Sequence, residues 1–381
     1  MKILFIHHNT ALDGSAISLF VILDGLRAKG VELALALPKI PLNEDFREKL
    51  ESLGIPYFTT NIVQSVADEE KYKVMTLRHR IKFLEDLYKR KIASCIALSK
   101  IVKQVKPDII HTNVGVIHEG YWIAKIYSIP HIFHLREYQD QDFGWKILPS
   151  KRWFEYILKK STIITITDGI KCNYELDNYT NAYTIHNGIL SKTKTDLRLP
   201  KEKFFFCASR ISPEKGLDCA ITAFGKFYQS HKDYQLIIAG EGPENYNREL
   251  KSLADNMGVE NSVQFIGQKD LNEVFEFMCR ATALLVCSHH EGLGRMTVEA
   301  SFAGCVVIGR NSSGTKEILD KTGGFVFDDD AEIPTLMDRL IQLPIEEYKQ
   351  RVLKAQRIAV KDFSTEQYID RIYDLYNTIL K

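Results

Sequence analysis

Apolar and polar positions alternate along the chain in two rhythms. Short apolar runs, typical of buried strands, are separated by stretches in which apolar residues recur every three or four positions, as in amphipathic helices. In the first half this pattern predicts strands at 3–6, 33–37, 109–111, 131–134 and 163–167. It predicts helices at 15–29, 44–53, 71–106 with an internal break, and 119–127. Such alternation indicates a parallel sheet covered by helices on both faces.

The rhythm restarts after residues 190–203, which are polar, charged and interrupted by Pro200, as expected of a linker. Strands follow at 204–208, 235–239, 263–266, 283–287 and 306–308, with helices at 215–230, 246–257 and 271–279. A last helix, 365–381, carries an apolar stripe that must pack on another element. We therefore predict an α/β protein with domains at 1–190 and 191–364 and a C-terminal helix at 365–381.

Composition agrees with two soluble globular domains. The chain has 381 residues, more than single cores of about 250 to 300 residues usually hold. Apolar residues make up 45% and charged residues 26% of the chain. The formal net charge of +1 gives no global argument for a nucleic-acid partner, so any electrostatic recognition must be local.

Cysteine usage and hydropathy bear on the compartment. The seven cysteines are scattered and form no CxxC pair, which favours reduced thiols over disulfides or a zinc site. The apolar run at the N-terminus is too short for a signal peptide, and no segment has the length of a membrane span. We expect a cytoplasmic protein.

Residues 283–319 contain the most informative chemistry. A strand is followed by a turn holding Glu291, and a helix that opens near Met296 carries Glu299 in its first turn. The amides at a helix N-terminus attract phosphates, and carboxylates accept hydrogen bonds from hydroxyl groups. This combination suits a ligand with hydroxyl groups at both ends and phosphates between them, and a nucleotide sugar fits.

The same residues resemble the glutamate-x7-glutamate signature of retaining glycosyltransferases of family 4, also called group 1. Here the signature stands as Ser288, then Glu291-Gly292-Leu293-Gly294, then Glu299-Ala300-Ser301-Phe302-Ala303-Gly304. The resemblance implies the GT-B fold, which has two doubly wound Rossmann-like domains facing across a cleft. It also implies that the last helix crosses back to the N-terminal domain.

The resemblance assigns roles within this signature. Glu299 would hold the ribose hydroxyls and Glu291 those of the donor sugar. The backbone at the start of the helix would meet the phosphates, through Gly292, Leu293 and Gly294.

Two further loops of the second domain match the family. Arg210 and Lys215 stand in an element similar to its Gly-Arg-x-x-x-x-Lys-Gly motif, with Ser209 at the first glycine. The resemblance implies that these two cations neutralise the departing diphosphate, where charge develops. Gly240 and Gly242 resemble its Gly-x-Gly-Pro turn and would line the pocket for the base, although such glycines also serve plain tight turns.

The N-terminal domain offers fewer matches. Gly14 and Ser15 follow the first strand and resemble the family's Gly-Gly loop, with Ser15 in place of the second glycine. The resemblance implies that Gly14 and Ser15 bind the sugar phosphate of the nucleotide sugar, and Ser15 could equally act as a helix N-cap. His134, at the end of a strand, matches a histidine that the family places near the anomeric carbon, and His111 is a weaker candidate of the same kind.

No metal site and no cofactor is expected. Asp328-Asp329-Asp330 might suggest a metal motif, but the segment reads as an exposed turn. Arg210 and Lys215 would supply the positive charge that a divalent ion supplies in other enzymes.

Residues 71–106 hold eleven basic and two acidic residues, interleaved with apolar ones at helical spacing. This pattern is typical of a helix lying on an anionic membrane. A solvated helix packed on the sheet has the same pattern, and Asp68, Glu69 and Glu70 just before it would weaken the local field.

Together these features predict a retaining, metal-independent glycosyltransferase. It would transfer a sugar from a UDP- or GDP-linked donor to a glycan or lipid-linked glycan acceptor, in bacterial surface polysaccharide synthesis such as capsule or lipopolysaccharide. A nucleotide-sugar 2-epimerase or hydrolase of the same fold is the first alternative. A non-catalytic glycosyltransferase-like subunit is the second, although such subunits would be expected to lose one of the four charged site residues, which are all present here.

Overall fold

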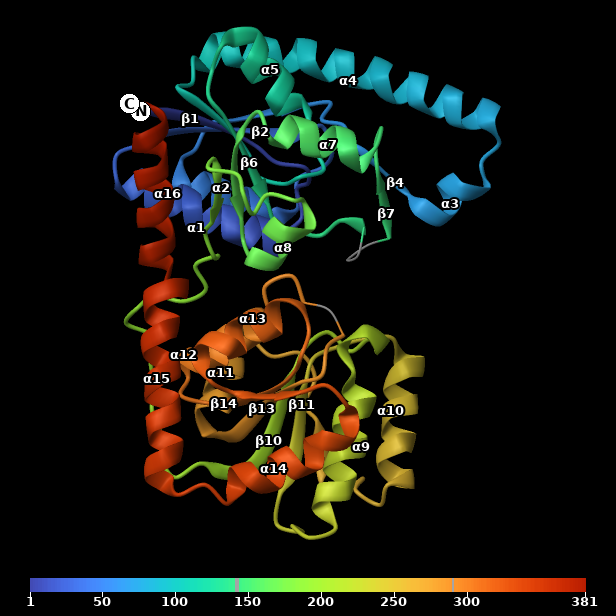
Figure 1. The fold of residues 1–381 in the computed structure, drawn as a ribbon, viewed down its shortest axis with the longest axis vertical. Coiled ribbons are helices and arrows are strands. Elements are labelled where there is room, and N and C mark those ends of the chain that lie inside the picture. The colour runs from blue at the N-terminus through green and yellow to red at the C-terminus, as the bar shows by residue number, and fades with distance from the viewer. Residues whose placement is uncertain (141–143, 290) are drawn as a thin grey trace. The chain divides into compact units, whose positions relative to one another are not determined.

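The computed structural model describes residues 1–140, 144–289 and 291–381. The chain divides into two compact units (Figure 1). Unit 1 contains Met1–Gly188 together with Glu366–Lys381, and unit 2 contains Ile189–Thr365. The C-terminal segment therefore belongs to the first unit, which is built from two separate stretches of the chain.

Unit 1 is built on a parallel sheet with the order β3-β2-β1-β5-β6-β8-β9. Its strands are β1 (Lys2–Ile6), β2 (Glu32–Pro38), β3 (Tyr57–Thr60), β5 (Ile109–Thr112), β6 (His131–Leu135), β8 (Thr162–Thr165) and β9 (Ala182–Thr184). A separate antiparallel pair joins β4 (Val66–Asp68) and β7 (Trp145–Ile147). The order reverses direction between β1 and β5, which is the usual ligand-binding point of such sheets.

Helices cover both faces of this sheet because its strands are apolar on both sides. Ile3 and Phe5 of β1 pack on one face with α1 (Gly14–Ala28), α2 (Glu44–Leu53) and α16 (Thr365–Ile379). Leu4 and Ile6 pack on the other face with α4 (Leu77–Val105) and α5 (Glu119–Tyr127). The unit also contains α3 (Glu69–Val74), α7 (Lys151–Leu158) and α8 (Asp168–Asn173).

Unit 2 repeats the plan with the parallel order β12-β11-β10-β13-β14-β15. The strands are β10 (Glu202–Ala208), β11 (Gln235–Ala239), β12 (Val263–Phe265), β13 (Ala281–Val286), β14 (Val306–Arg310) and β15 (Phe325–Phe327). The helices are α9 (Leu217–Tyr228), α10 (Glu244–Asn256), α11 (Leu271–Arg280), α12 (Arg295–Phe302), α13 (Ser313–Thr322), α14 (Ile333–Ile341) and α15 (Ile345–Phe363). Its reversal point lies between β10 and β13.

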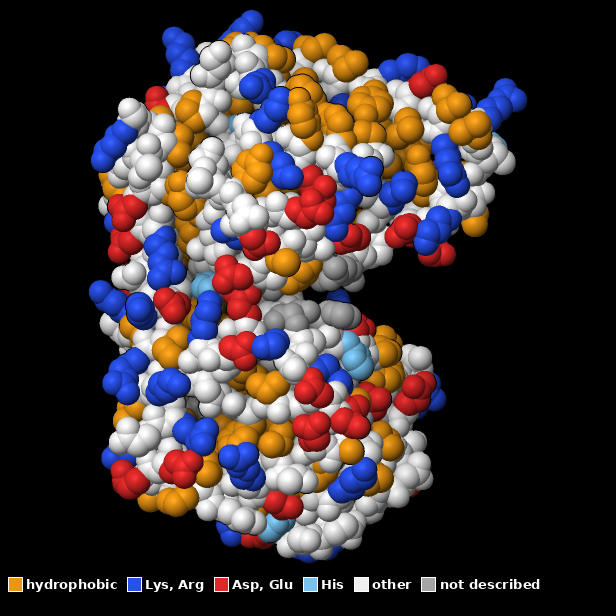
Figure 2. Space-filling view, viewed as in Figure 1, with side chains coloured by type: hydrophobic (Ala, Val, Ile, Leu, Met, Phe, Trp, Pro, Cys, Tyr) orange, Lys and Arg blue, Asp and Glu red, His pale blue; other side chains and the backbone are white. Residues whose placement is uncertain are grey.

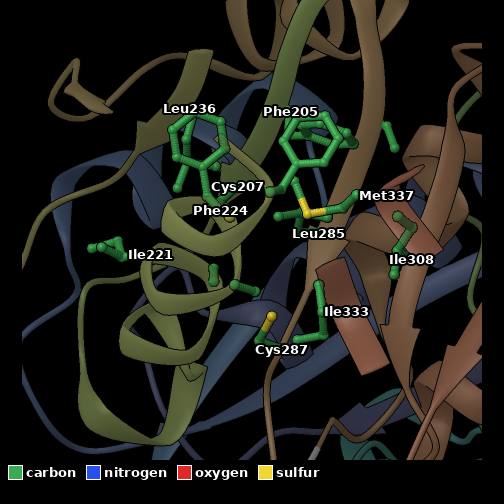
Figure 3. Packing of buried hydrophobic residues seen from close by; sticks show 14 of the residues in the cluster. Phe205, Cys207, Ile221, Phe224, Leu236, Leu285, Cys287, Ile308, Ile333 and Met337 are labelled. Atoms are coloured by element: carbon green, nitrogen blue, oxygen red, sulfur yellow. The ribbon is translucent and has the colours of Figure 1, made fainter. Parts of the chain in front are cut away.

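The core of unit 2 lies between this sheet and α9, α10 and α14. Phe205 and Leu236 from the sheet meet Phe224 of α9, and Ile333 and Met337 of α14 close the other side (Figure 3). Cys207 and Cys287 belong to the same core, and burial raises the pKa of the Cys207 thiol to about 12. The seven cysteines are all free, and these two pack as small apolar side chains.

The structure corrects some predicted boundaries. The predicted helix at 215–230 is instead a 3-10 turn at Pro213–Lys215 followed by α9, because Gly216 adopts a left-handed conformation between them. The segment 71–106 is broken at Met75 and Thr76, where Thr76 caps α4. Among the described residues, no helix combines the length and the apolar character needed to cross a membrane.

Candidate functional site

A pocket of about 200 Å³ lies at the reversal point of the sheet in unit 2. Its walls come from the end of β10 and the loop after it, the end of β13 and the loop after it, and the first turn of α12. Three of the predicted site side chains line it together: Arg210, Lys215 and Glu291. Ligands of open parallel sheets bind at this kind of position, so the fold itself places these residues at a binding site.

The loop after β10 carries the two predicted cations. Lys215 ends the 3-10 turn, and its Nζ lies 2.7 Å from Glu291 Oε1, with both side chains about one-fifth exposed. Arg210 pairs with Glu214 at 2.9 Å, and its side chain is 72% exposed. Lys215 is therefore fixed within the pocket, whereas Arg210 sits at its rim with room to move.

Gly240 and Gly242 support this loop from the neighbouring strand end. A Cβ at Gly240 would lie 1.8 Å from the carbonyl oxygen of Ser209, and one at Gly242 would lie 1.9 Å from that of Ile211. The amide of Ile211 also donates to the carbonyl of Glu241. Neither glycine is among the residues that line the pocket. Their observed task is to let two backbones approach closely, and contact with a base stays a prediction.

The loop after β13 holds Glu291 and the glycines that follow it. The amide of Gly314 donates to the carbonyl of Glu291, and the amide of His289 donates to that of Glu214. Gly294 has a φ of 73° and is the residue before the first turn of α12. Leu293 is buried, and Gly292 is half-buried. The loop is thus anchored on both sides before it enters the helix.

The first turn of α12 forms the pocket's third wall. No side chain caps this helix, so its first amides are available to a ligand. Thr297 lines the pocket and is fully buried, yet its Oγ1 has no hydrogen-bond partner within the described residues. A buried hydroxyl without a partner is costly, which indicates that a polar ligand completes it.

Glu299 does not line the pocket, in contrast to the expectation that both glutamates would converge there. Its Oε1 accepts a hydrogen bond of 2.6 Å from Nε of Arg295, one helical turn earlier. Burial raises the pKa of the Glu299 carboxyl, and Arg295 opposes that shift. Arg295 itself lines the pocket, so Glu299 holds a side chain of the pocket wall in place.

Arg295 is the site residue that the sequence analysis missed. A cation at the start of a helix opposes the helix dipole, so its presence there calls for a compensating anion. Glu299 supplies one negative charge to it. The sequence shows an arginine and a glutamate four positions apart at the start of a helix, which predicts their ion pair but not that Arg295 lines the pocket.

His134 lies in unit 1 on β6 and is fully buried. Its Nδ1 is 3.2 Å from His111 Nε2 and 3.4 Å from a guanidinium nitrogen of Arg136. Burial, with Arg136 and His111 adding to it, holds the pKa of His134 well below its usual range. The histidine is therefore neutral at pH 7 and belongs to a buried polar cluster.

Arg136, the centre of this cluster, was also missed. Its guanidinium is almost fully buried and donates to Asn113, Asn187 and the hydroxyl of Tyr368 on α16. These partners come from distant parts of the sequence, so no local pattern could have shown them.

Gly14 and Ser15 begin α1, after the end of β1. The N-cap of α1 is Asp13, whose carboxylate accepts from the amide of Ala16, so the capping role considered for Ser15 was wrong. Ser15 instead donates its hydroxyl to Asp13 at 2.7 Å. Nothing lies within 4 Å of a Cβ placed on Gly14, so this position is open.

Comparison with known proteins identifies a family that the second half of the chain matches. The glycosyl transferases group 1 family matches residues 191–358, which is most of unit 2. An uncharacterized 42.6 kDa protein from the cps region of Klebsiella pneumoniae is 28% identical over 314 residues, 76% of this chain and 77% of the relative. An alpha-monoglucosyldiacylglycerol synthase of Streptococcus pneumoniae is 25% identical over 312 residues, 73% of this chain and 68% of the relative.

Solved structures support the same fold. The crystal structure of Alr3699/HepE from Anabaena, in complex with UDP, has a TM-score of 0.79 and 18% sequence identity, covering 99% of this chain and 100% of that chain. This likeness, with the two Rossmann-like sheets, confirms the predicted fold class. The chain therefore has the GT-B fold, and its residues 191–358 match the glycosyl transferases group 1 family, which supports glycosyltransferase activity.

Proposed function

We propose that this glycosyltransferase moves a sugar from a UDP- or GDP-linked donor to an acceptor hydroxyl, with retention at the anomeric carbon and without a metal ion. The observation that carries the proposal is the pocket of unit 2. Lys215, Arg210 and Arg295 surround it at the start of α12, where the hydroxyl of Thr297 has no hydrogen-bond partner among the described residues. Cations and helix amides at one place favour a phosphorylated ligand.

The two cations of the β10 loop fit the charge that develops during transfer. As the bond between sugar and diphosphate breaks, negative charge grows on the diphosphate oxygens, and fixed positive groups stabilise that state most. Lys215 is now neutralised by Glu291 at 2.7 Å. A bound diphosphate would share Lys215 and leave Glu291 to accept hydrogen bonds from sugar hydroxyls.

Arg295 extends the same argument to the helix start. Glu299 fixes its guanidinium from within the helix, which lowers the entropy lost when a phosphate binds. The contact of Glu299 with ribose hydroxyls remains part of the proposal. The amides that follow Gly294 would then hold the phosphate that Arg295 and Lys215 approach.

We assign the acceptor to unit 1 and the nucleotide sugar to unit 2. Gly14 is open to an approaching ligand, and Ser15 follows it on the first turn of α1. Burial holds the pKa of His134 well below its usual range, so this histidine would contribute as a neutral hydrogen-bonding group. The relative from a cps region supports a role in surface polysaccharide synthesis. The UDP in the HepE complex supports a uridine donor, with GDP as the alternative.

Calorimetric titration with UDP, GDP and ADP tests the donor assignment. We expect one of these nucleotides to bind, and we expect Lys215→Ala to lower kcat for transfer by about 100-fold or more, the usual effect of losing one charge-stabilising group. Lys226→Ala, an exposed lysine on α9, is the matched control and should behave as the native protein. Normal turnover by Lys215→Ala would refute the proposed role of the pocket.

Product analysis tests the reaction type. Proton NMR of the first product formed should show the donor's anomeric configuration, and EDTA should leave the rate unchanged. An inverted product would exclude a retaining mechanism. Nucleotide release that is equally fast without any acceptor would favour the hydrolase or epimerase alternative.

A further inference from the structure

An apolar groove of about 580 Å³ lies between α4 and α5 in unit 1 and reaches the start of α7. We call it the α4–α5 groove. Its large side chains are Tyr88, Ile92, Ile96, Trp122, Ile126 and Trp153. The groove is separate from the sheet's reversal point and from every residue assigned to the transfer reaction.

The groove exposes side chains that a folded protein normally buries. Tyr88, Ile92, Ile96, Trp122 and Ile126 are each between 42% and 69% exposed. Leu77 and Ile81 continue the same apolar stripe along α4 and are also exposed. The other face of α4 packs on the sheet, so the exposed stripe is not used to hold α4 in place. Contiguous exposed apolar surface of this kind usually marks an interaction site.

Positive charge runs beside the stripe. Arg78, Lys82, Lys89 and Lys100 are exposed and separated by 4, 7 and 11 residues, which places them on one line of the helix. The space-filling view shows orange side chains gathered over α4 with blue ones among them (Figure 2). The helix carries eight basic and two acidic residues, a difference of +6, whereas the whole chain has a net charge of +1.

One acid of α4 offsets part of this charge, because Glu85 is exposed and lies on the same line, three residues after Lys82 and four before Lys89. The acids that precede α4 do not neutralise the remaining cations. Glu69 and Glu70 of α3 pair with Lys73, and Asp68 with Lys71, so they are taken by lysines outside α4. Within the groove, Lys91 is neutralised by Glu119 at 3.6 Å. The groove is therefore apolar and neutral within, and cationic along its outer edge.

We infer that the α4–α5 groove binds an anionic membrane lipid, with a hydrocarbon chain in the groove and the headgroup at the lysines of the parallel stripe. An apolar channel beside a cationic line matches the two parts of such a lipid. A protein partner would need acidic residues in register with this line, whereas a bilayer surface offers negative charge at every position. The inference goes beyond the proposed function and does not depend on it.

Vesicle flotation tests the surface. The native protein should float with vesicles of phosphatidylcholine and phosphatidylglycerol, and much less with phosphatidylcholine alone. Lys82→Gln with Lys89→Gln should lower the partition coefficient by roughly 25-fold, about fivefold for each lysine. Ile92→Glu with Ile96→Glu should lower it roughly tenfold or more, because it removes apolar contact and adds repulsion. All four side chains are exposed, so these variants should fold.

The matched controls make the same kinds of substitution at exposed positions elsewhere in the chain. Lys39→Gln with Lys226→Gln and, separately, Ile40→Glu alter exposed residues away from the groove and should bind as the native protein does. Lys215→Ala should also bind vesicles normally, which separates this inference from the transfer reaction. Undiminished binding by the groove variants would overturn the inference. A second outcome would also overturn it: the native protein forms oligomers that Ile92→Glu with Ile96→Glu dissociates, and neither the native protein nor any variant binds vesicles.

Tryptophan fluorescence tests whether a chain enters the groove. The protein has three tryptophans, and Trp122 and Trp153 line the groove with ring centroids 5.7 Å apart. In Trp145→Phe only these two report. Phosphatidylglycerol brominated on its acyl chain should quench them, and the unbrominated lipid should not. Vesicle binding without quenching would show that the groove stays empty, which would refute the inference.

Discussion

Lys91 and Glu119 show how a single charge in unit 1 depends on its neighbour. The Glu119 side chain is 1% exposed, and its two oxygens accept from the amides of Val63 and His118 while Lys91 lies 3.6 Å away. Burial lowers the pKa of Lys91 and raises that of Glu119, and the charge on each partner opposes the shift of the other. Each residue is therefore ionised at low cost only while the other is present.

Glu119→Gln should destabilise unit 1 by about 3 kcal/mol, because it leaves a buried lysine without a counter-charge. The measurement is chemical denaturation followed by circular dichroism. Glu119→Gln combined with Lys91→Met should recover most of the loss, since no unpaired charge then remains buried. A single variant as stable as the native protein would mean that Lys91 simply turns out to solvent.

At the scale of elements, α16 packs closely against α1. A Cβ at Gly25 of α1 would lie 2.0 Å from Cδ1 of Ile369 on α16. Tyr368, Ile372 and Tyr376 of α16 pack in the same core as β1. The amphipathic stripe of the C-terminal helix thus finds its partner in unit 1, and a glycine in the middle of α1 makes the approach possible.

Gly25→Ala should destabilise unit 1 by about 1 to 3 kcal/mol, although alanine is normally better than glycine inside a helix. The reason is the branched Ile369 side chain, which cannot turn away from the added methyl. Thermal unfolding gives the measurement. Gly14→Ala, where the added Cβ meets nothing, is the matched control for stability.

The double variant Gly25→Ala with Ile369→Ala tests the cause, because removing the clashing atoms should restore part of the loss. Equal stability of Gly25→Ala and Gly14→Ala would show that α16 adjusts its position freely.

At the scale of the whole chain, buried histidines are concentrated in unit 1. Burial is the largest cause of the lowered pKa of His7 and of His131, which falls to about 3 for both. The same direction holds for His111, His118 and His134. None of the histidines that the structure describes in unit 2 is buried. The two units should therefore differ in their response to acid.

The direction in which stability changes with pH follows from proton uptake. Because the folded pKa of each histidine is depressed, the unfolded chain binds more protons once the pH falls below about 6.5. Full stability is present above that value and is lost as the pH falls. Each buried histidine should cost unit 1 about 1 kcal/mol between about pH 7.5 and about pH 5.5.

Hydrogen–deuterium exchange measured by mass spectrometry follows peptides of each unit separately. Peptides of unit 1 should lose protection on acidification before those of unit 2 do. His131→Gln, which can keep a hydrogen bond to Thr112 or Ser161, should reduce this acid sensitivity. Parallel loss of protection in both units would contradict the assignment.

Local periodicity predicted most of the sheet and most helices, since buried parallel strands are continuous apolar runs. It did not predict β3, β4, β7, β9 or β15, because strands of only three or four residues are too short to show a periodic pattern. Within the site, Arg210, Lys215 and Glu291 could be found from glycine-flanked loops at strand ends. Arg295 and Thr297 could not be selected without knowing which side of α12 faces the pocket.

The sequence alone determined the two α/β units, the parallel character of their sheets, and three charged residues of the pocket. These features depend on local patterns, namely hydrophobic period, turn residues and motif spacing. Only the tertiary structure decided that Arg295 faces the pocket, that Gly240 and Gly242 brace a neighbouring loop, and that Arg136 contacts Asn113, Asn187 and Tyr368. The physical reason is that burial and these hydrogen bonds depend on contacts between residues distant in sequence, which form only when the chain folds.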